Sequence, residues 1–116
     1  MKATFVETRG FTDAVVDFLT DDAYAGLQHR LMENPDSGDV MRGCGGLRKI
    51  RVADAKRNKG KRSGARVIYL QVPAAQRFYM IDIYGKDEMD DLTAVEKKHL
   101  RELAAQLTQE AIAANQ

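Results

Sequence analysis

The sequence predicts a single α+β domain over residues 1–116, in which a helical hairpin and a C-terminal helix pack on a mainly antiparallel four-stranded sheet. Two patterns favour this fold. Three segments carry apolar residues at the three-to-four-residue spacing of helices, and four shorter segments have the alternation or the β-branched residues of strands. A length of 116 residues with a hydrophobic fraction of 44% is sufficient for one folded core.

The first strand and two helices are expected in the N-terminal third of the chain. Lys2–Thr8 alternates loosely, as a strand does. Phe11–Leu19 has apolar residues at helical spacing, and a second helix follows the cap residue Thr20. This helix should end at Asn34, because a residue before proline, here Pro35, avoids the helical region. Two helices joined so closely form a hairpin.

Three further strands and a last helix complete the expected order. The strands are Leu47–Ala53, Arg66–Val72 and Gln76–Tyr84, and their consecutive arrangement predicts an antiparallel meander. A capping box, Thr93 to Glu96, starts the last helix. The apolar stripe of that helix consists of Val95, Leu100, Leu103, Ala104, Leu107 and Ala111. The predicted order is therefore βααβββα, with the helices covering one face of the sheet.

The positive charge is concentrated in one part of the chain. Between residues 42 and 66 there are ten basic residues and one acidic residue, a net charge of +9. The other eight basic and sixteen acidic residues give −8, so the total of +1 conceals a strong asymmetry. A basic surface on an otherwise acidic protein is typical of a site for a polyanion, although an exposed hairpin can also carry a solvated run of charge.

Several classes of protein are disfavoured by the sequence. No apolar run approaches the ~20 residues that span a bilayer, and the first residues lack the apolar centre of a secretory signal. The one cysteine, Cys44, offers neither an internal disulfide nor a set of metal ligands. We therefore expect a cytoplasmic protein with no membrane partner and no metal or other cofactor.

Three segments together resemble a known group of proteins. They are GGLRKIRV, residues 45–52; SGARVIY, residues 63–69, which follows a Lys/Gly-rich loop; and FYMIDIYGKDEMDDL, residues 78–92. In this combination the chain resembles the RelE/ParE superfamily of bacterial toxins, most closely the HigB-like branch of RelE toxins. The resemblance implies a ribosome-dependent, metal-independent mRNA endonuclease. In such enzymes the ribose 2′-hydroxyl attacks the adjacent phosphate, and a cognate antitoxin, often a helix-turn-helix protein, keeps the enzyme inactive.

The resemblance assigns candidate catalytic residues on two of the strands. Arg66 matches the arginine that RelE enzymes hold against the scissile phosphate, and its planar fork suits two phosphate oxygens. Lys49 and Arg51 match the basic pair on the second RelE strand, and alternation places them on one strand face about 7 Å apart. A lysine crowded by arginines has a lowered pKa and can accept a proton. Alternatively, both residues only hold the RNA backbone.

Two further catalytic candidates, Tyr84 and Lys86, lie where the fourth strand ends. RelE proper has two basic residues after the equivalent glycine and a tyrosine further on, whereas this chain has Lys86, then Asp87 and Glu88, and no later tyrosine. Tyr84 is therefore the candidate for the tyrosine's role of stacking on the substrate or protonating it, with packing in the core as its alternative. Glu88 is either a proton shuttle or an acid that leads into the last helix.

The remaining basic residues are expected to bind RNA without sequence preference. Arg48 falls on the opposite strand face from Lys49 and is expected to make contacts at the strand end. Phosphate contacts are expected from the loop residues. These are Lys56, Arg57, Lys59, Lys61 and Arg62.

Two other functions remain open at this point. A ParE-like inhibitor of gyrase would have the same scaffold, because fold does not determine function. A non-enzymatic RNA-binding module would use the cations alone, although an aromatic fraction of 7% is low for stacking on free single strands.

Overall fold

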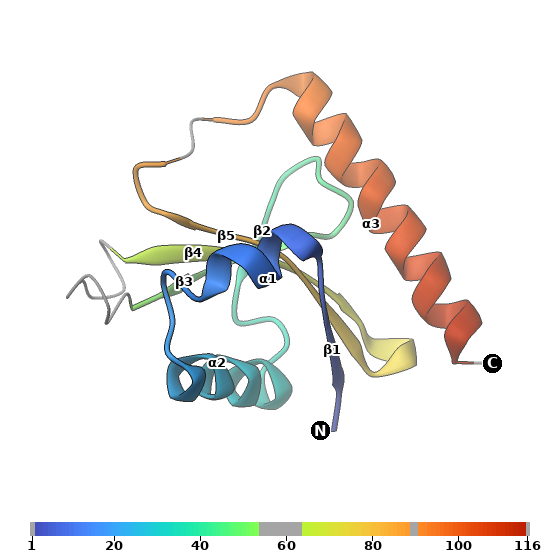
Figure 1. Cartoon of the computed structure of the whole chain (residues 1–116). Helices are drawn as coiled ribbons and strands as arrows, with labels where there is room; N and C mark the ends of the chain where they lie inside the picture. Colours follow the sequence, from blue (N-terminus) through green and yellow to red (C-terminus); the bar gives the residue numbers. More distant parts are fainter. Residues whose placement is uncertain (1, 54–63, 89–90, 116) are drawn as a thin grey trace.

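The computed structural model describes residues 2–53, 64–88 and 91–115, and within these ranges the chain forms three α-helices and a mixed five-stranded sheet. The elements follow one another as shown in Figure 1. They are β1 (Thr4–Glu7), α1 (Arg9–Val15), α2 (Asp21–Glu33), β2 (Asp39–Val40), β3 (Arg48–Val52), β4 (Ala65–Val72), the 3₁₀ turn η2 (Pro73–Ala75), β5 (Arg77–Gly85) and α3 (Ala94–Ala114). The predicted α+β class is confirmed, whereas the predicted count of four strands is wrong.

The ends of the helices follow from side-chain caps. Thr8 accepts a hydrogen bond from the backbone N–H of Phe11, and Thr20 accepts one from that of Ala23. The predicted capping box of α3 is present, because Thr93 and Glu96 each accept a hydrogen bond from the other's backbone N–H. Each cap satisfies N–H groups that have no partner inside the helix. Helix α1 ends at Val15, earlier than predicted, and the chain then turns to bury Phe18 and Leu19.

The strand missing from the prediction is β2, a two-residue strand in segment 35–46, which contains four glycines and is called the glycine-rich loop below. The sheet order is β1-β5-β4-β3-β2, with β1 parallel to β5 and every other pair antiparallel. Asp39 pairs with Lys49, and Val40 pairs with Arg48. Two residues are too few to show alternation, so sequence periodicity does not detect such a strand.

Tertiary contacts hold the segment before β2 against the sheet. The hydroxyl of Tyr69 donates a hydrogen bond to the carbonyl of Pro35 and accepts one from the N–H of Gly38. A Cβ at Gly38 would lie 2.8 Å from Cε1 of Tyr69, so only glycine allows this approach. The buried tyrosine on β4 therefore fixes the chain where β2 begins.

The helices cover both faces of the sheet, which corrects the expectation that they cover one. Helices α1 and α2 pack on one face through a core that includes Phe11, Leu27 and Leu31, while α3 packs on the other through Ala104 and Ala111. The reason is visible in β4 and β5, since nearly every residue of both strands is buried. A strand that is apolar on both faces needs a covering layer on each side.

Helix α3 is held by the glycine-rich loop as well as by the sheet. A Cβ at Gly45 would lie 3.1 Å from both the Cα of Arg101 and the Cβ of Ala104, and Gly45 has a φ of +72°. The guanidinium of Arg101 donates a 2.8 Å hydrogen bond to the carbonyl of Gly43. Val95, predicted in the apolar stripe, is instead 62% exposed. None of the helices in the described ranges is long and apolar enough to cross a membrane.

The close approach of Gly45 to α3 predicts a large effect of a methyl group there. Gly45→Ala should destabilise the protein by about 2 kcal/mol, because alanine is strained at positive φ and would press on the helix backbone. Gly26→Ala is the matched control, since a Cβ at Gly26 of α2 meets no atom within 4 Å. It should stabilise the helix by about 0.5 to 1 kcal/mol. Urea unfolding measures both changes, and equal effects would contradict the close packing of the loop on α3.

Candidate functional site

A β-bulge in β5 brings Tyr84 to the face of the sheet that carries Lys49, Arg51 and Arg66. Ile68 of β4 pairs with Asp82, but the next residue, Tyr69, pairs with Met80, so Ile81 is an extra residue in β5. Beyond the bulge the alternation is reversed. Ile83 consequently joins the core beneath α1 and α2, and Tyr84 joins the core on the α3 side.

Three neighbouring strands then place three of the candidates in one row. Arg51 of β3 lies directly opposite Arg66 of β4, and Arg66 lies directly opposite Tyr84 of β5. Residues directly opposite one another in antiparallel strands share a face, so the three side chains leave the sheet on the α3 side. Lys49 lies two residues before Arg51 in β3 and shares this face, as alternation predicts.

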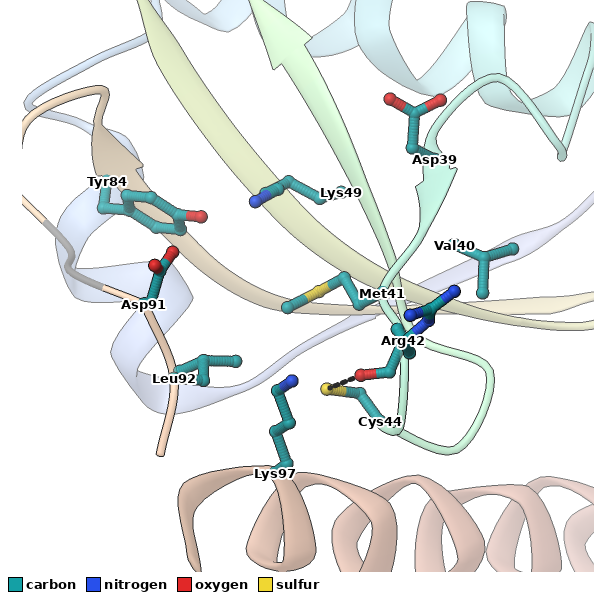
Figure 2. A pocket seen from close by; sticks show the side chains of 10 residues that line it. All are labelled: Asp39, Val40, Met41, Arg42, Cys44, Lys49, Tyr84, Asp91, Leu92 and Lys97. Atoms are coloured by element: carbon teal, nitrogen blue, oxygen red, sulfur yellow. Dashed lines mark hydrogen bonds between the residues drawn. The ribbon is translucent and has the colours of Figure 1, made fainter. Parts of the chain in front are cut away.

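A first cavity lies between this face and α3. It has a volume of about 450 Å³ and combines an apolar floor with groups of both charges. Figure 2 shows the Lys49 ammonium and the Tyr84 hydroxyl pointing toward each other across the cavity, with the Asp91 carboxylate beside Tyr84. The lining residues are Asp39, Val40, Met41, Arg42, Cys44, Lys49, Tyr84, Asp91, Leu92 and Lys97.

The second cavity lies at the edge of β3 and is more strongly basic. It has a volume of about 490 Å³ and contains three arginines that come from α2, β3 and β4. Its lining consists of Arg30, Ser37, Asp39, Lys49, Ile50, Arg51 and Arg66. Lys49 and Asp39 line both cavities, so these two residues mark the boundary between them. An extended anionic chain that binds both cavities therefore passes Lys49.

The surroundings of Tyr84 raise the pKa of its hydroxyl. Tyr84 is 8% exposed, and its burial raises the pKa of the phenol above the ordinary value. The nearby Asp82 carboxylate raises this pKa further, and the Arg66 guanidinium opposes both effects. Burial also raises the pKa of Asp82 itself. At neutral pH Tyr84 is therefore a hydrogen-bond donor with a proton to give.

Lys86 and Glu88 lie in the turn after β5, outside the lining of both cavities. The backbone N–H of Lys86 donates a hydrogen bond to the carbonyl of Gly64, which joins this turn to the start of β4. The Glu88 carboxyl folds back over Gly85, where a Cβ would lie 2.8 Å from Glu88 Oε1. Neither residue is among those that line the two cavities.

Arg48 has a role in holding the fold. Its guanidinium donates a 2.8 Å hydrogen bond to the carbonyl of Gly38 and forms an ion pair with Asp36 at 3.3 Å. This matches the expected contact at the strand end, and binding of RNA by Arg48 would have to compete with these partners. The predicted loop cations Lys56, Arg57, Lys59, Lys61 and Arg62 lie outside the described residues.

Several residues in the cavities were absent from the predicted site. Asp39 and Arg30 line the basic cavity, and Asp91 and Lys97 line the other. They belong to segments far apart in the sequence, and no local pattern connects them with Lys49. The capping box that starts at Thr93 is the one local signal that could have placed Asp91 just before the start of α3.

No protein-family model matches the sequence. The site also has no recognisable set of metal ligands in the part of the chain that the structure describes. Cys44 is buried there and its thiol contacts the carbonyl of Arg42 at 3.6 Å. The functional interpretation therefore rests on the geometry of the basic face and on the sequence resemblance.

The contacts of Arg48 predict that its removal weakens the fold. Arg48→Ala should lower the free energy of unfolding by about 2 kcal/mol, because a charge-assisted hydrogen bond to a partly buried carbonyl is lost. Arg9→Ala is the control, since the Arg9 side chain is 96% exposed and lies 3.9 Å from Asp13. An exposed pair of this kind contributes little. Similar urea midpoints for the two variants would contradict a structural role of Arg48.

Proposed function

We propose that the protein is a RelE-like, HigB-like toxin that cleaves mRNA on the ribosome and thereby inhibits translation. The observation that carries the proposal is the cross-strand row of Arg51, Arg66 and Tyr84, with Lys49 on the same face. Cations from separate strands at one site are suited to a phosphodiester, whose negative charge increases in the transition state. The ribosome with its message and a cytoplasmic antitoxin are the partners in this proposal.

The proposed reaction is an internal transfer at the scissile phosphate. The 2′-oxygen attacks phosphorus and loses its proton, while the bond from phosphorus to the 5′-oxygen breaks. The products are a 2′,3′-cyclic phosphate and a 5′-hydroxyl, so the reaction needs no water, oxidant or metal for its balance. Arg51 and Arg66 are assigned to the phosphate oxygens, where two planar forks can each bind two atoms.

The proton transfers are assigned to groups on either side of this phosphate. Tyr84 is assigned as the acid at the 5′-oxygen, because its hydroxyl carries a proton at neutral pH and lines the same cavity as Lys49. The 2′-proton is assigned to Lys49 or to the carboxylate of Asp39, the residue that lies opposite Lys49 in the pairing of β2 with β3. Both residues line both cavities and so lie at the boundary between them.

Binding without cleavage is the second candidate function. The observation that favours it is the 8% exposure of Tyr84, together with the position of Lys86 outside both cavities. A site with a shielded acid can hold a phosphodiester through its arginines and leave the bond intact. This candidate predicts tight complexes with ribosomes and an uncut message.

Cleavage by the purified protein tests the proposal directly. Added to ribosomes that are translating a defined message, it should cut that message in the decoding site and leave a 2′,3′-cyclic phosphate. Arg66→Ala should lower the cleavage rate by about 100-fold or more, because one donor to the developing charge is lost. Tyr84→Phe should lower it while the protein stays folded.

The control for these variants is Arg9→Ala, which removes an exposed arginine of α1 that lies outside both cavities. It should cleave at the rate of the unchanged protein. An uncut message with wild-type protein bound to ribosomes would support the binding function and end the nuclease proposal. DNA breaks trapped in a gyrase supercoiling assay would instead indicate a ParE-like inhibitor.

A further inference from the structure

The basic cavity contains an arginine that the proposed reaction does not use. Arg30 lies in the last turn of α2, on the side of the sheet opposite to α3, yet it lines the same cavity as Arg51 and Arg66. Arg30 can reach the cavity from that side because β2 covers the edge of β3 only at Arg48 and Lys49. The edge of β3 from Ile50 onward extends beyond β2, and the cavity continues there around the edge toward α2.

The charge of this cavity exceeds what one phosphodiester needs. Among the described residues that line it, four side chains are basic and one, Asp39, is acidic. A phosphodiester carries a single negative charge, so binding one of them would leave an excess of positive charge in a confined volume. Like charges held this close repel one another, and a second anion removes that repulsion.

We propose that Arg30 binds a second phosphodiester of the same message, adjacent in the strand to the one held by Arg51 and Arg66. The inference rests on the proposed function and extends it from a single scissile phosphate to a clamp on two phosphates. Ser37 also lines this cavity, but its hydroxyl donates a 2.7 Å hydrogen bond to the carbonyl of Asn34, so Arg30 is the donor assigned to the second group. In this arrangement the RNA backbone passes from the cavity beside Tyr84, over Lys49, to the edge of β3 and α2.

A structural role of Arg30 makes different predictions. A cation in the last turn of a helix interacts favourably with the helix dipole, and Arg30 also lies close enough to Tyr69 to oppose the burial-induced rise of its pKa. If these interactions were its only role, removal of Arg30 would lower the unfolding temperature and leave the salt dependence of RNA binding unchanged. A purely structural role therefore predicts a change in the unfolding temperature alone, whereas binding of a phosphate predicts a change in the salt dependence of RNA binding.

The test uses the full chain and an RNA oligonucleotide methylated at every 2′-oxygen, which presents phosphates and cannot be cut. Binding is measured by fluorescence anisotropy over a range of salt concentrations for wild type, Arg30→Ala, Arg30→Lys and the control Arg9→Ala. Arg30→Ala should weaken binding by about tenfold and reduce the slope of log affinity against log salt by about 0.7. Arg30→Lys should restore most of the slope, because a single phosphate contact needs a cation rather than a fork.

Cleavage on the ribosome separates this inference from the proposed function. Arg30→Ala should raise KM while kcat stays within about threefold of wild type, since binding rather than chemistry is affected. An unchanged salt slope with Arg30→Ala overturns the inference and leaves the nuclease proposal intact. Weaker binding to ribosomes with unchanged binding to the oligonucleotide also overturns it, because the contact would then be with ribosomal RNA. If wild type cuts nothing, the proposed function fails, and the salt slopes still decide the role of Arg30.

Discussion

The extra residue in β5 determines which side chains of the last strand meet those of β3 and β4. With uninterrupted alternation after Met80, Tyr84 would point toward α1 and α2, away from Arg66. The bulge at Ile81 reverses the alternation, so Ile83 fills the core and Tyr84 faces the first cavity. A β-bulge typically re-aims side chains in this way beside functional sites. The addition of Tyr84 to the pair of Arg51 and Arg66 depends on this one irregularity.

The scaffold around the row is rigid because β4 and β5 are buried on both faces. The core under α1 and α2 and the core under α3 fix the two strands from opposite sides, so the cations at their ends project from a well-packed sheet. Crowded cations raise the free energy of the unliganded protein through mutual repulsion. Asp39 and Asp91 offset part of that repulsion at the cavities, and a bound polyanion would remove more of it. The fixed position of the cations and their mutual repulsion thus both favour a polyanionic ligand.

The sequence was sufficient for the parts of the fold that local rules govern. Thr20, Asn34 and the Thr93–Glu96 capping box give nearly the observed helix ends, and alternation correctly places Lys49 and Arg51 on one face. Features that depend on contacts between distant segments were not predicted from the sequence. The pairing of β2 is fixed by Tyr69 through Gly38, and the apolar runs of β4 and β5 indicate two covered faces only in retrospect.

The candidate site likewise has residues that the sequence identifies and an arrangement that only the folded chain determines. Arg66 and Tyr84 were named from the resemblance, but their common face follows from a bulge that no period-two pattern reveals. Arg30 and Asp39 join the cavity through the packing of α2 and β2 against β3, which depends on the whole chain. Lys86 is close to Tyr84 in sequence but lies in a turn outside both cavities. The RelE-like topology and activity stay predictions.

The central claim is that Lys49, Arg51, Arg66 and Tyr84 form one surface for an RNA backbone. Amide chemical shifts measured by NMR during titration with a 2′-O-methylated oligonucleotide test it residue by residue. The account predicts that the largest shift changes fall on β3, on the start of β4 and on the end of β5, and that they lessen as salt is added. Changes confined to α1 and the outer edge of β1, with none at these four residues, would contradict it.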